Sequence, residues 1–301
     1  MLWILDVGAG PGDWANGIAD RYPKAKVVAV DAAVWETDET EPERKNVFWE
    51  IDDLDVGEVP GAREAEATAL ESQMQSMSIR LESLRGRADS KAEDLADTGQ
   101  DQAVKLSPQS SPPLSEPRGW CFTTLFDFIH IRGMKGAFTS WPAIYAEVFK
   151  SLNPGGYVEV VDFETPLQSI NPDSELRRLI SATWEAAQKS GCALGTAHLD
   201  PAAFEAAGLM HVKTTTVDVP VGMWHEDEEQ RALGKKWLVC CIEGMEAMCL
   251  RLLTKEMEWS VERVKEACRK VADEFLSGMH DGLTTPFRFV VARKTRNGAE
   301  G

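Results

Sequence analysis

The sequence predicts an α/β fold in which helices cover both faces of a largely parallel sheet. Three observations support this prediction. The chain of 301 residues opens on an apolar run, residues 3–7, that leads into a glycine-rich turn. Further short apolar segments alternate with helical patterns along the chain. Acidic residues stand at or near the ends of the first three strand-like segments, where the carboxyl ends of parallel strands meet.

The first strand and the turn after it predict a ligand site. Gly8, Gly10 and Gly12 stand at alternate positions, so the backbone there can approach a ligand closely before a helix begins near Asp13. A dinucleotide-binding turn has its third small residue at the position that Asp13 occupies here. Asp6 also suits a cationic ligand better than a pyrophosphate, which its carboxylate would repel. Both departures favour S-adenosylmethionine, whose sulfonium amino acid is cationic.

The next two strands extend this site. Residues 26–30 form an apolar segment that ends at Asp31, where an acid binds a ribose diol in this architecture. A third segment, residues 46–51, is followed by Asp52 and Asp53. We expect Asp53 to accept a hydrogen bond from the adenine amine. Three acids in strand order predict a single cofactor site.

The fourth strand is predicted over residues 126–132 and carries two candidate functional residues. We expect His130 to lie where the donor methyl and the substrate meet, as the candidate general base. The alternative is that its backbone only lines the cofactor pocket. Arg132 is the candidate partner of a carboxylate, either that of the substrate or that of the cofactor. His198 is a further candidate base, but a histidine in a loop is usually solvated.

The remaining elements are mostly helical. The patterns predict helices over 141–152, 174–190, 201–207, 226–253 and 260–275, and strands over 157–161, 211–219 and 287–292. Asn153-Pro154-Gly155-Gly156 separates the first of these helices from the strand that follows. Apolar residues in 226–253 repeat at helical spacing. They predict packing against the sheet or, alternatively, a methionine-rich wall over an apolar substrate.

Several of these stretches together resemble the fungal LaeA-like methyltransferases. They are the Phe126–Arg132 strand, the helix start at Ser140-Trp141-Pro142, Asn153 to Glu159, Glu243 to Glu246, and Leu252-Leu253-Thr254. The family consists of class I, S-adenosylmethionine-dependent proteins linked to secondary metabolism, and the resemblance covers residues 1–55 and 119–294. It implies a Rossmann-like seven-stranded sheet whose last two strands are antiparallel. The helices between those two strands are then an insertion.

The resemblance implies methyl transfer to oxygen, nitrogen or sulfur of a small secondary metabolite. Some members of the family are instead regulators of gene clusters, so a regulatory protein that binds S-adenosylmethionine and acts through protein partners is an alternative. An inactive, truncated methyltransferase is another. The chain starts two residues before the first strand, whereas the family usually has helices there that close over the cofactor.

Residues 56–118 interrupt the family pattern. The part from Asp89 to Pro117 is rich in Ser, Pro, Asp and Gln, which predicts disorder. The earlier part predicts a short amphipathic helix that packs on the domain or binds a protein partner, because its apolar residues repeat at spacings of four and three: Leu70, Met74, Met77, Leu81 and Leu84. A translated intron is the alternative. Residues 295–301 are expected to be a tail.

Composition limits the remaining possibilities. The net charge is −17 and the longest basic cluster is Lys235-Lys236, which argues against direct binding of nucleic acid. No run of 18 apolar residues predicts a membrane span, and no signal peptide precedes the first strand. The six cysteines form no C-x-x-C pair, so we expect reduced thiols and no metal. These features favour a cytoplasmic protein, with the nucleus as an alternative.

Overall fold

The computed structural model describes residues 1–35, 44–56 and 119–296. Contacts divide the chain into two compact units, of which the first comprises Met1–Gly57 and Gly119–Gly301 and the second Glu58–Arg118. The amphipathic helix and the disorder predicted within 57–118 lie outside the described residues, as does the tail beyond residue 296.

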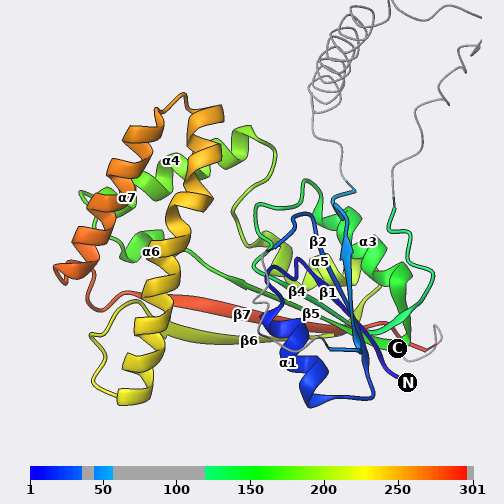
Figure 1. The fold of residues 1–301 in the computed structure, drawn as a ribbon. Helices are drawn as coiled ribbons and strands as arrows, with labels where there is room; N and C mark the ends of the chain where they lie inside the picture. Colours follow the sequence, from blue (N-terminus) through cyan, green and yellow to red (C-terminus); the bar gives the residue numbers. More distant parts are fainter. Residues whose placement is uncertain (36–43, 57–118, 297–301) are drawn as a thin grey trace, which may run out of the picture. The chain divides into compact units, whose positions relative to one another are not determined.

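In the described part of the chain, seven strands form one sheet in the order β3-β2-β1-β4-β5-β7-β6 (Figure 1). The strands are β1 (Trp3–Val7), β2 (Lys26–Asp31), β3 (Val47–Ile51), β4 (Phe126–Arg132), β5 (Leu152–Phe163), β6 (Met210–Pro220) and β7 (Thr284–Arg293). The first five strands pair in parallel, and β7 is antiparallel to both β5 and β6. This arrangement confirms the predicted Rossmann-like sheet and its antiparallel last pair.

The helices are α1 (Asp13–Arg21), α3 (Trp141–Ser151), α4 (Glu175–Lys189), α5 (Pro201–Ala206), α6 (Glu228–Glu256) and α7 (Val261–Leu276), with short 3-10 turns at Leu167–Ser169 and Ala197–Leu199. Five of them begin at a residue whose side chain accepts a backbone N–H of the first turn: Ser140, Ser174, Asp200, Asp227 and Ser260. Such caps satisfy donors that the helix itself leaves unpaired, which explains where these helices start.

The two faces of the sheet bury different clusters. Leu5 and Ile129 pack with Ile144 of α3 and Phe204 of α5 on one face. On the other face small residues predominate, and Ala15 of α1 packs there within the cluster that contains Ile4, Ala19, Ala25, Val27 and Ala29. Small side chains allow α1 to lie close to β1 and β2, so the turn between β1 and α1 stays near the ends of the strands.

The helices α4, α6 and α7 form a separate layer with its own core (Figure 1). Leu179 of α4 meets Leu253 of α6 and Val264 of α7 in this cluster, and all three are buried. Because α6 and α7 lie between β6 and β7 in the chain, they are the expected helical insertion before the last strand. This layer provides most of one wall of the cavity described below.

One element differs from its prediction. The strand expected over 157–161 extends from Leu152 to Phe163, with an irregular register against β4 between Phe126 and Phe128. The Asn-Pro-Gly-Gly stretch ends the preceding helix at Ser151, as predicted, but the backbone continues directly into the strand. At the other end, Phe163 adds a carbonyl that becomes part of the candidate site.

Candidate functional site

The glycine turn adopts a backbone that side chains rarely allow. Gly8, Gly10 and Gly12 have φ angles of +70°, +56° and +93°. A Cβ on Gly8 would overlap the thioether of Met134, and one on Gly12 would overlap the indole of Trp49. At Gly10 nothing lies within 4 Å of that position among the described residues. The turn is therefore packed at both ends and open at its middle.

Asp31 ties the end of β2 to this turn. Its Oδ2 accepts the N–H of Gly10 at 2.8 Å, and its Oδ1 accepts the N–H of Ala33 at 2.9 Å. Each carboxylate oxygen has a further lone pair that a ligand hydroxyl can use. Asp53 is exposed after β3, where its Oδ1 accepts the N–H of Asp55 at 3.0 Å. The structure thus brings Asp31 to the turn and leaves Asp53 on the surface beyond the neighbouring strand.

Asp6 and His130 form a buried pair between adjacent strands. They are register partners on β1 and β4, and His130 Nδ1 lies 2.9 Å from Asp6 Oδ1. The Trp14 ring of α1 stacks on the imidazole at 3.8 Å, and His130 is only 2% exposed. The other ring nitrogen of His130 lies 3.8 Å from Glu159 Oε1. His130 is thus packed beneath α1 and is absent from the lining of the cavity described next.

The second carboxylate oxygen of Asp6, Oδ2, is buried with no hydrogen-bond partner among the described residues. An unpaired buried acceptor is costly, so it marks a place where a donor of a ligand would be accommodated. Arg132 is exposed at the end of β4, on the same edge of the sheet as the turn.

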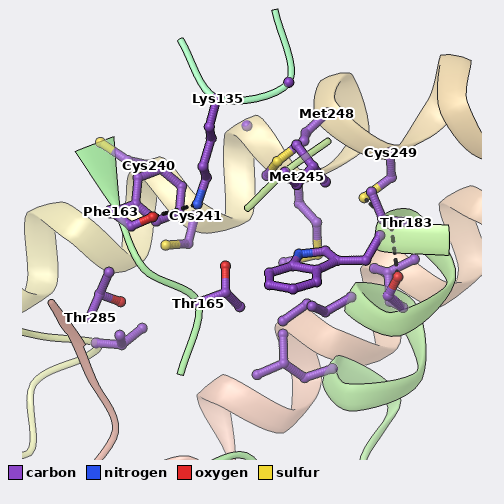
Figure 2. Close-up of a pocket in the computed structure, with 18 of the residues that line it drawn as sticks. Lys135, Phe163, Thr165, Thr183, Cys240, Cys241, Met245, Met248, Cys249 and Thr285 are labelled. Carbon is purple, nitrogen blue, oxygen red and sulfur yellow. Dashed lines mark hydrogen bonds between the residues drawn. The ribbon is translucent and has the colours of Figure 1, made fainter. Parts of the chain in front are cut away.

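A cavity of about 510 Å³ lies between the helical layer and the ends of β4 and β5 (Figure 2). Its walls are predominantly apolar and aromatic, and include Phe163, Trp184, Trp237, Met245 and Met248. Its volume falls within the range of sites that bind small organic molecules. Part of α6 packs in the core of the helical layer, and Met245 and Met248 line the cavity; that they face an apolar substrate stays a prediction.

Two basic residues line this cavity, and of these Arg251 is exposed whereas Lys135 is half-buried. Its Nζ donates to the carbonyl of Phe163 at 2.6 Å and lies 3.3 Å from the centroid of the Phe163 ring. Its backbone N–H donates to Asp162 Oδ2 at 2.8 Å, which fixes the start of the side chain. Burial lowers the pKa of Lys135 to about 8, because the apolar surroundings disfavour the ammonium.

The cavity also contains sulfur and hydroxyl groups. Cys240 and Cys241 of α6 and Cys249 about two turns further line it, and all are free thiols. Burial raises the pKa of Cys241 to about 12, so this thiol stays protonated. The hydroxyl of Thr183 donates to the carbonyl of Leu179 at 2.8 Å and lies 3.4 Å from Cys249 Sγ. These groups offer weak polar contacts to a ligand.

His198 corrects an expectation. A solvated loop position was expected, but His198 is 5% exposed and stacks on Trp141 at 3.9 Å. Its Nε2 lies 3.6 Å from Asp162 Oδ2 and has no hydrogen-bond partner among the described residues. The loop is held inward because its backbone carbonyl accepts the Tyr145 hydroxyl at 2.7 Å.

Lys135 was missed by the sequence analysis. Gly133 and Gly136 bracket Met134 and Lys135, and both glycines have positive φ angles, +68° and +78°. Glycines on either side of a methionine–lysine pair after a parallel strand are the signal that could have marked this loop. The loop joins the two halves of the site, because Met134 contacts the glycine turn while Lys135 reaches the cavity.

Within the described ranges, no group of three or more His, Cys, Asp or Glu residues is placed to bind a metal ion. None of the helices in those ranges combines the length and the apolar character needed to cross a bilayer.

Comparison with known proteins places this geometry in a family. The sequence model described as "Methyltransferase domain" matches residues 3–214. Methyltransferase pytC of Aspergillus terreus is 28% identical over 178 residues, which cover 58% of this chain and 54% of that protein. Secondary metabolism regulator LAE1 of Cochliobolus heterostrophus is 23% identical over 263 residues, covering 86% of this chain and 65% of that protein.

The chain thus spans between half and two thirds of the length of these curated relatives. The matched segment contains the glycine turn, Asp31, the β4 loop with Lys135 and the first part of β6. It confirms the resemblance to fungal secondary-metabolism methyltransferases, and with it S-adenosylmethionine as the cofactor. On this match, which extends over most of the sheet, the glycine turn and the loop after β4, the chain belongs to the methyltransferase domain family.

Proposed function

We propose that this chain transfers the methyl group of S-adenosylmethionine to a small, largely apolar molecule held in the cavity. The observation that carries the proposal is the loop after β4. Met134 packs on Gly8 of the glycine turn, and the next residue, Lys135, lines the cavity. Methyl transfer requires a donor and an acceptor held side by side, and this loop connects the candidate cofactor site at the glycine turn with the candidate substrate site in the cavity.

The residues of the turn fit the cofactor. The open space over Gly10 lets a ligand approach the backbone, and Asp31 beside it offers acceptors for a ribose diol. The unpaired Oδ2 of Asp6 offers a buried acceptor under the turn. We assign Asp53 to the adenine amine and Arg132 to a carboxylate, both from their places at the same edge of the sheet. When bound, the cofactor supplies an electrophilic methyl group.

The protein's own contribution is then mainly positioning. An in-line displacement needs a base only when the acceptor atom must lose a proton. His130 remains the predicted base, although its contacts with Asp6 and Trp14 are those of a buried, packed pair. If it acts as a base, His130→Asn abolishes methylation while the affinity for S-adenosylhomocysteine is kept. Loss of both would indicate a structural role.

Calorimetric titration with S-adenosylhomocysteine tests the cofactor site directly. We expect a single site, and Asp31→Ala should weaken binding by about 1–3 kcal/mol because two ribose hydroxyls lose their acceptors. The matched control is Asp52→Ala, an exposed carboxylate beside Asp53 at the end of β3, which should bind as the parent does. Absence of heat at millimolar ligand would overturn the proposal.

A regulatory role is the second candidate. The relative from Cochliobolus heterostrophus is named as a secondary metabolism regulator, and its match extends over 86% of this chain. In that case the chain acts through a protein partner, for which residues 70–84 are the predicted contact, and in the nucleus rather than the cytoplasm. A fluorescent fusion in a fungal host, with and without residues 57–118, would separate the two. If the chain is an enzyme, deleting residues 57–118 should change neither its location in the cell nor the methylated metabolite that the host produces. If it is a regulator, the deletion should abolish both its nuclear location and production of the metabolite.

A further inference from the structure

We propose that the cavity takes an apolar molecule that carries one oxyanion, and that the Lys135 ammonium binds this oxyanion. The inference rests on the proposed function, since it names the class of molecule that the cavity selects. A carboxylate and an ionised phenol are the two sources of such a group.

Lys135 has hydrogen-bonding capacity left over. An ammonium has three N–H donors, and one of them donates to the carbonyl of Phe163. Among the described residues, no carboxylate oxygen lies within 4.0 Å of Nζ, so the charge has no ion-pair partner. Glu164, the acid next along the chain from Phe163, pairs instead with Arg288 at 3.0 Å. The positive charge is therefore held in place without a direct ion pair, although the charges of Asp162 and Glu164 act on it from further away.

The apolar surroundings of Lys135 favour binding of an oxyanion to its charge. The walls around it are mostly carbon and sulfur, from Phe163, Trp237 and Met245 among others (Figure 2). Burial lowers the pKa of Lys135 to about 8, so the group is still mostly protonated at neutral pH. An oxyanion brought by a ligand would supply the missing partner in a weakly polar site, where such a charge-assisted hydrogen bond is strong.

The same geometry argues against a cationic substrate. Quaternary and protonated amines are commonly recognised by aromatic faces. Here the Phe163 face is already taken by Lys135 itself, at 3.3 Å from the ring centroid. A cationic ligand in the cavity would be repelled by the Lys135 ammonium and could not contact the Phe163 face. Neutral apolar molecules would fit the walls but would leave the ammonium unpaired.

The experiment is a binding titration in the absence of cofactor, with 2-naphthoic acid, its neutral isostere 2-naphthamide, and 4-nitrophenol as the phenolate source. We expect the acid to bind at least tenfold more tightly than the amide at pH 7. If only the carboxylate binds, the source is a carboxylic acid; if 4-nitrophenol also binds near pH 7.5, where it is largely ionised and Lys135 is still mostly protonated, an ionised phenol also qualifies. Equal affinity for acid and amide would overturn the proposal.

Variants locate the effect. Lys135→Met keeps a stem of similar length and should remove the preference for the acid, whereas Lys135→Arg should retain it. Lys213→Met, which removes an exposed ammonium on β6, is the matched control and should behave as the parent. A preference that survives Lys135→Met would refute the assignment. Each variant should still bind S-adenosylhomocysteine, which shows that it is folded and separates this test from that of the proposed function.

The parent protein alone provides a further check. The preference for 2-naphthoic acid should decrease as the pH rises past the pKa of Lys135, because the neutral amine no longer attracts the carboxylate. Asp162, Glu164 and Cys241 are the other titratable groups whose charges act on Lys135. The Cys241 thiol, with its pKa near 12, is protonated over the range from pH 7 to 9.5. A preference independent of pH in that range would contradict the role of Lys135.

Discussion

Lys135→Met should make the protein more stable at neutral pH, although it removes a hydrogen bond. The pKa of Lys135 falls from 10.5 to about 8 on folding, because burial disfavours the ammonium. Each pKa unit corresponds to about 1.4 kcal/mol, so the buried charge costs about 3 kcal/mol at pH 7. Methionine avoids this cost but leaves the Phe163 carbonyl without its donor, a loss of about 1 kcal/mol. The expected net gain is about 2 kcal/mol.

The pH dependence makes this prediction specific. Between about pH 8 and 10.5 the unfolded chain still holds the lysine proton while the folded protein has released it, so the stability of the parent rises with pH in that window. Lys135→Met has no such group. The advantage of the variant should therefore shrink by about 2 kcal/mol between pH 7 and 9.5, and vanish near its upper end.

Urea unfolding of both proteins, followed by tryptophan fluorescence and circular dichroism at several pH values, measures this difference. Lys213→Met is again the control, because removing an exposed charge usually changes stability by less than about 0.5 kcal/mol. Two results would refute the reasoning that the Lys135 ammonium is buried without an ion-pair partner. One is a variant less stable than the parent at pH 7, and the other is a difference in unfolding free energy that stays constant with pH.

Three further predictions concern the rest of the fold. Deleting residues 57–118 should leave the melting temperature unchanged or raised, because the flanking segments are already joined by the hydrogen bond from Trp120 Nε1 to the Leu54 carbonyl at 3.0 Å; a fall of more than about 8 °C would contradict this. Asp6→Ala should cost about 2–3 kcal/mol in urea unfolding, since it leaves the buried His130 ring unpaired, and a loss below about 0.5 kcal/mol would show that the pair is unimportant. Gly10→Ala should lower the affinity for S-adenosylhomocysteine at least tenfold. The control Gly191→Ala, at a glycine with a similar positive φ and open surroundings, should leave this affinity unchanged and cost only about 1–2 kcal/mol of stability.

Local signals were sufficient for most of the fold. The apolar runs of β1 and β2 and the cap at Ser260 are contained in a few neighbouring residues, and the elements other than β5 start and end within about three positions of their predictions. The acid at Asp31 was also placed correctly beside the turn, because the ends of adjacent parallel strands meet at one edge. These features depend on short-range chemistry and on a common topology.

Other parts of the site depend on contacts that no local pattern contains. Lys135 looks like a solvated loop residue, and it is buried only because α6, about 100 residues later in the chain, folds back over it. His198 is similarly drawn inward by Trp141 and Tyr145 of a distant helix. In both cases the side chain is covered by elements that are distant in the sequence, so the residues next to it do not predict its burial.

The loop that carries Met134 and Lys135 also has a thermodynamic consequence. One of these neighbours rests on Gly8 and the other lines the cavity, so a shift of the backbone between them changes both surroundings together. If such a shift accompanies binding on one side, the free energies of the two binding events are linked, and linkage is reciprocal. The factor by which a naphthoate changes the affinity for S-adenosylhomocysteine must then equal the factor measured in the opposite order, which gives two independent routes to a single coupling energy.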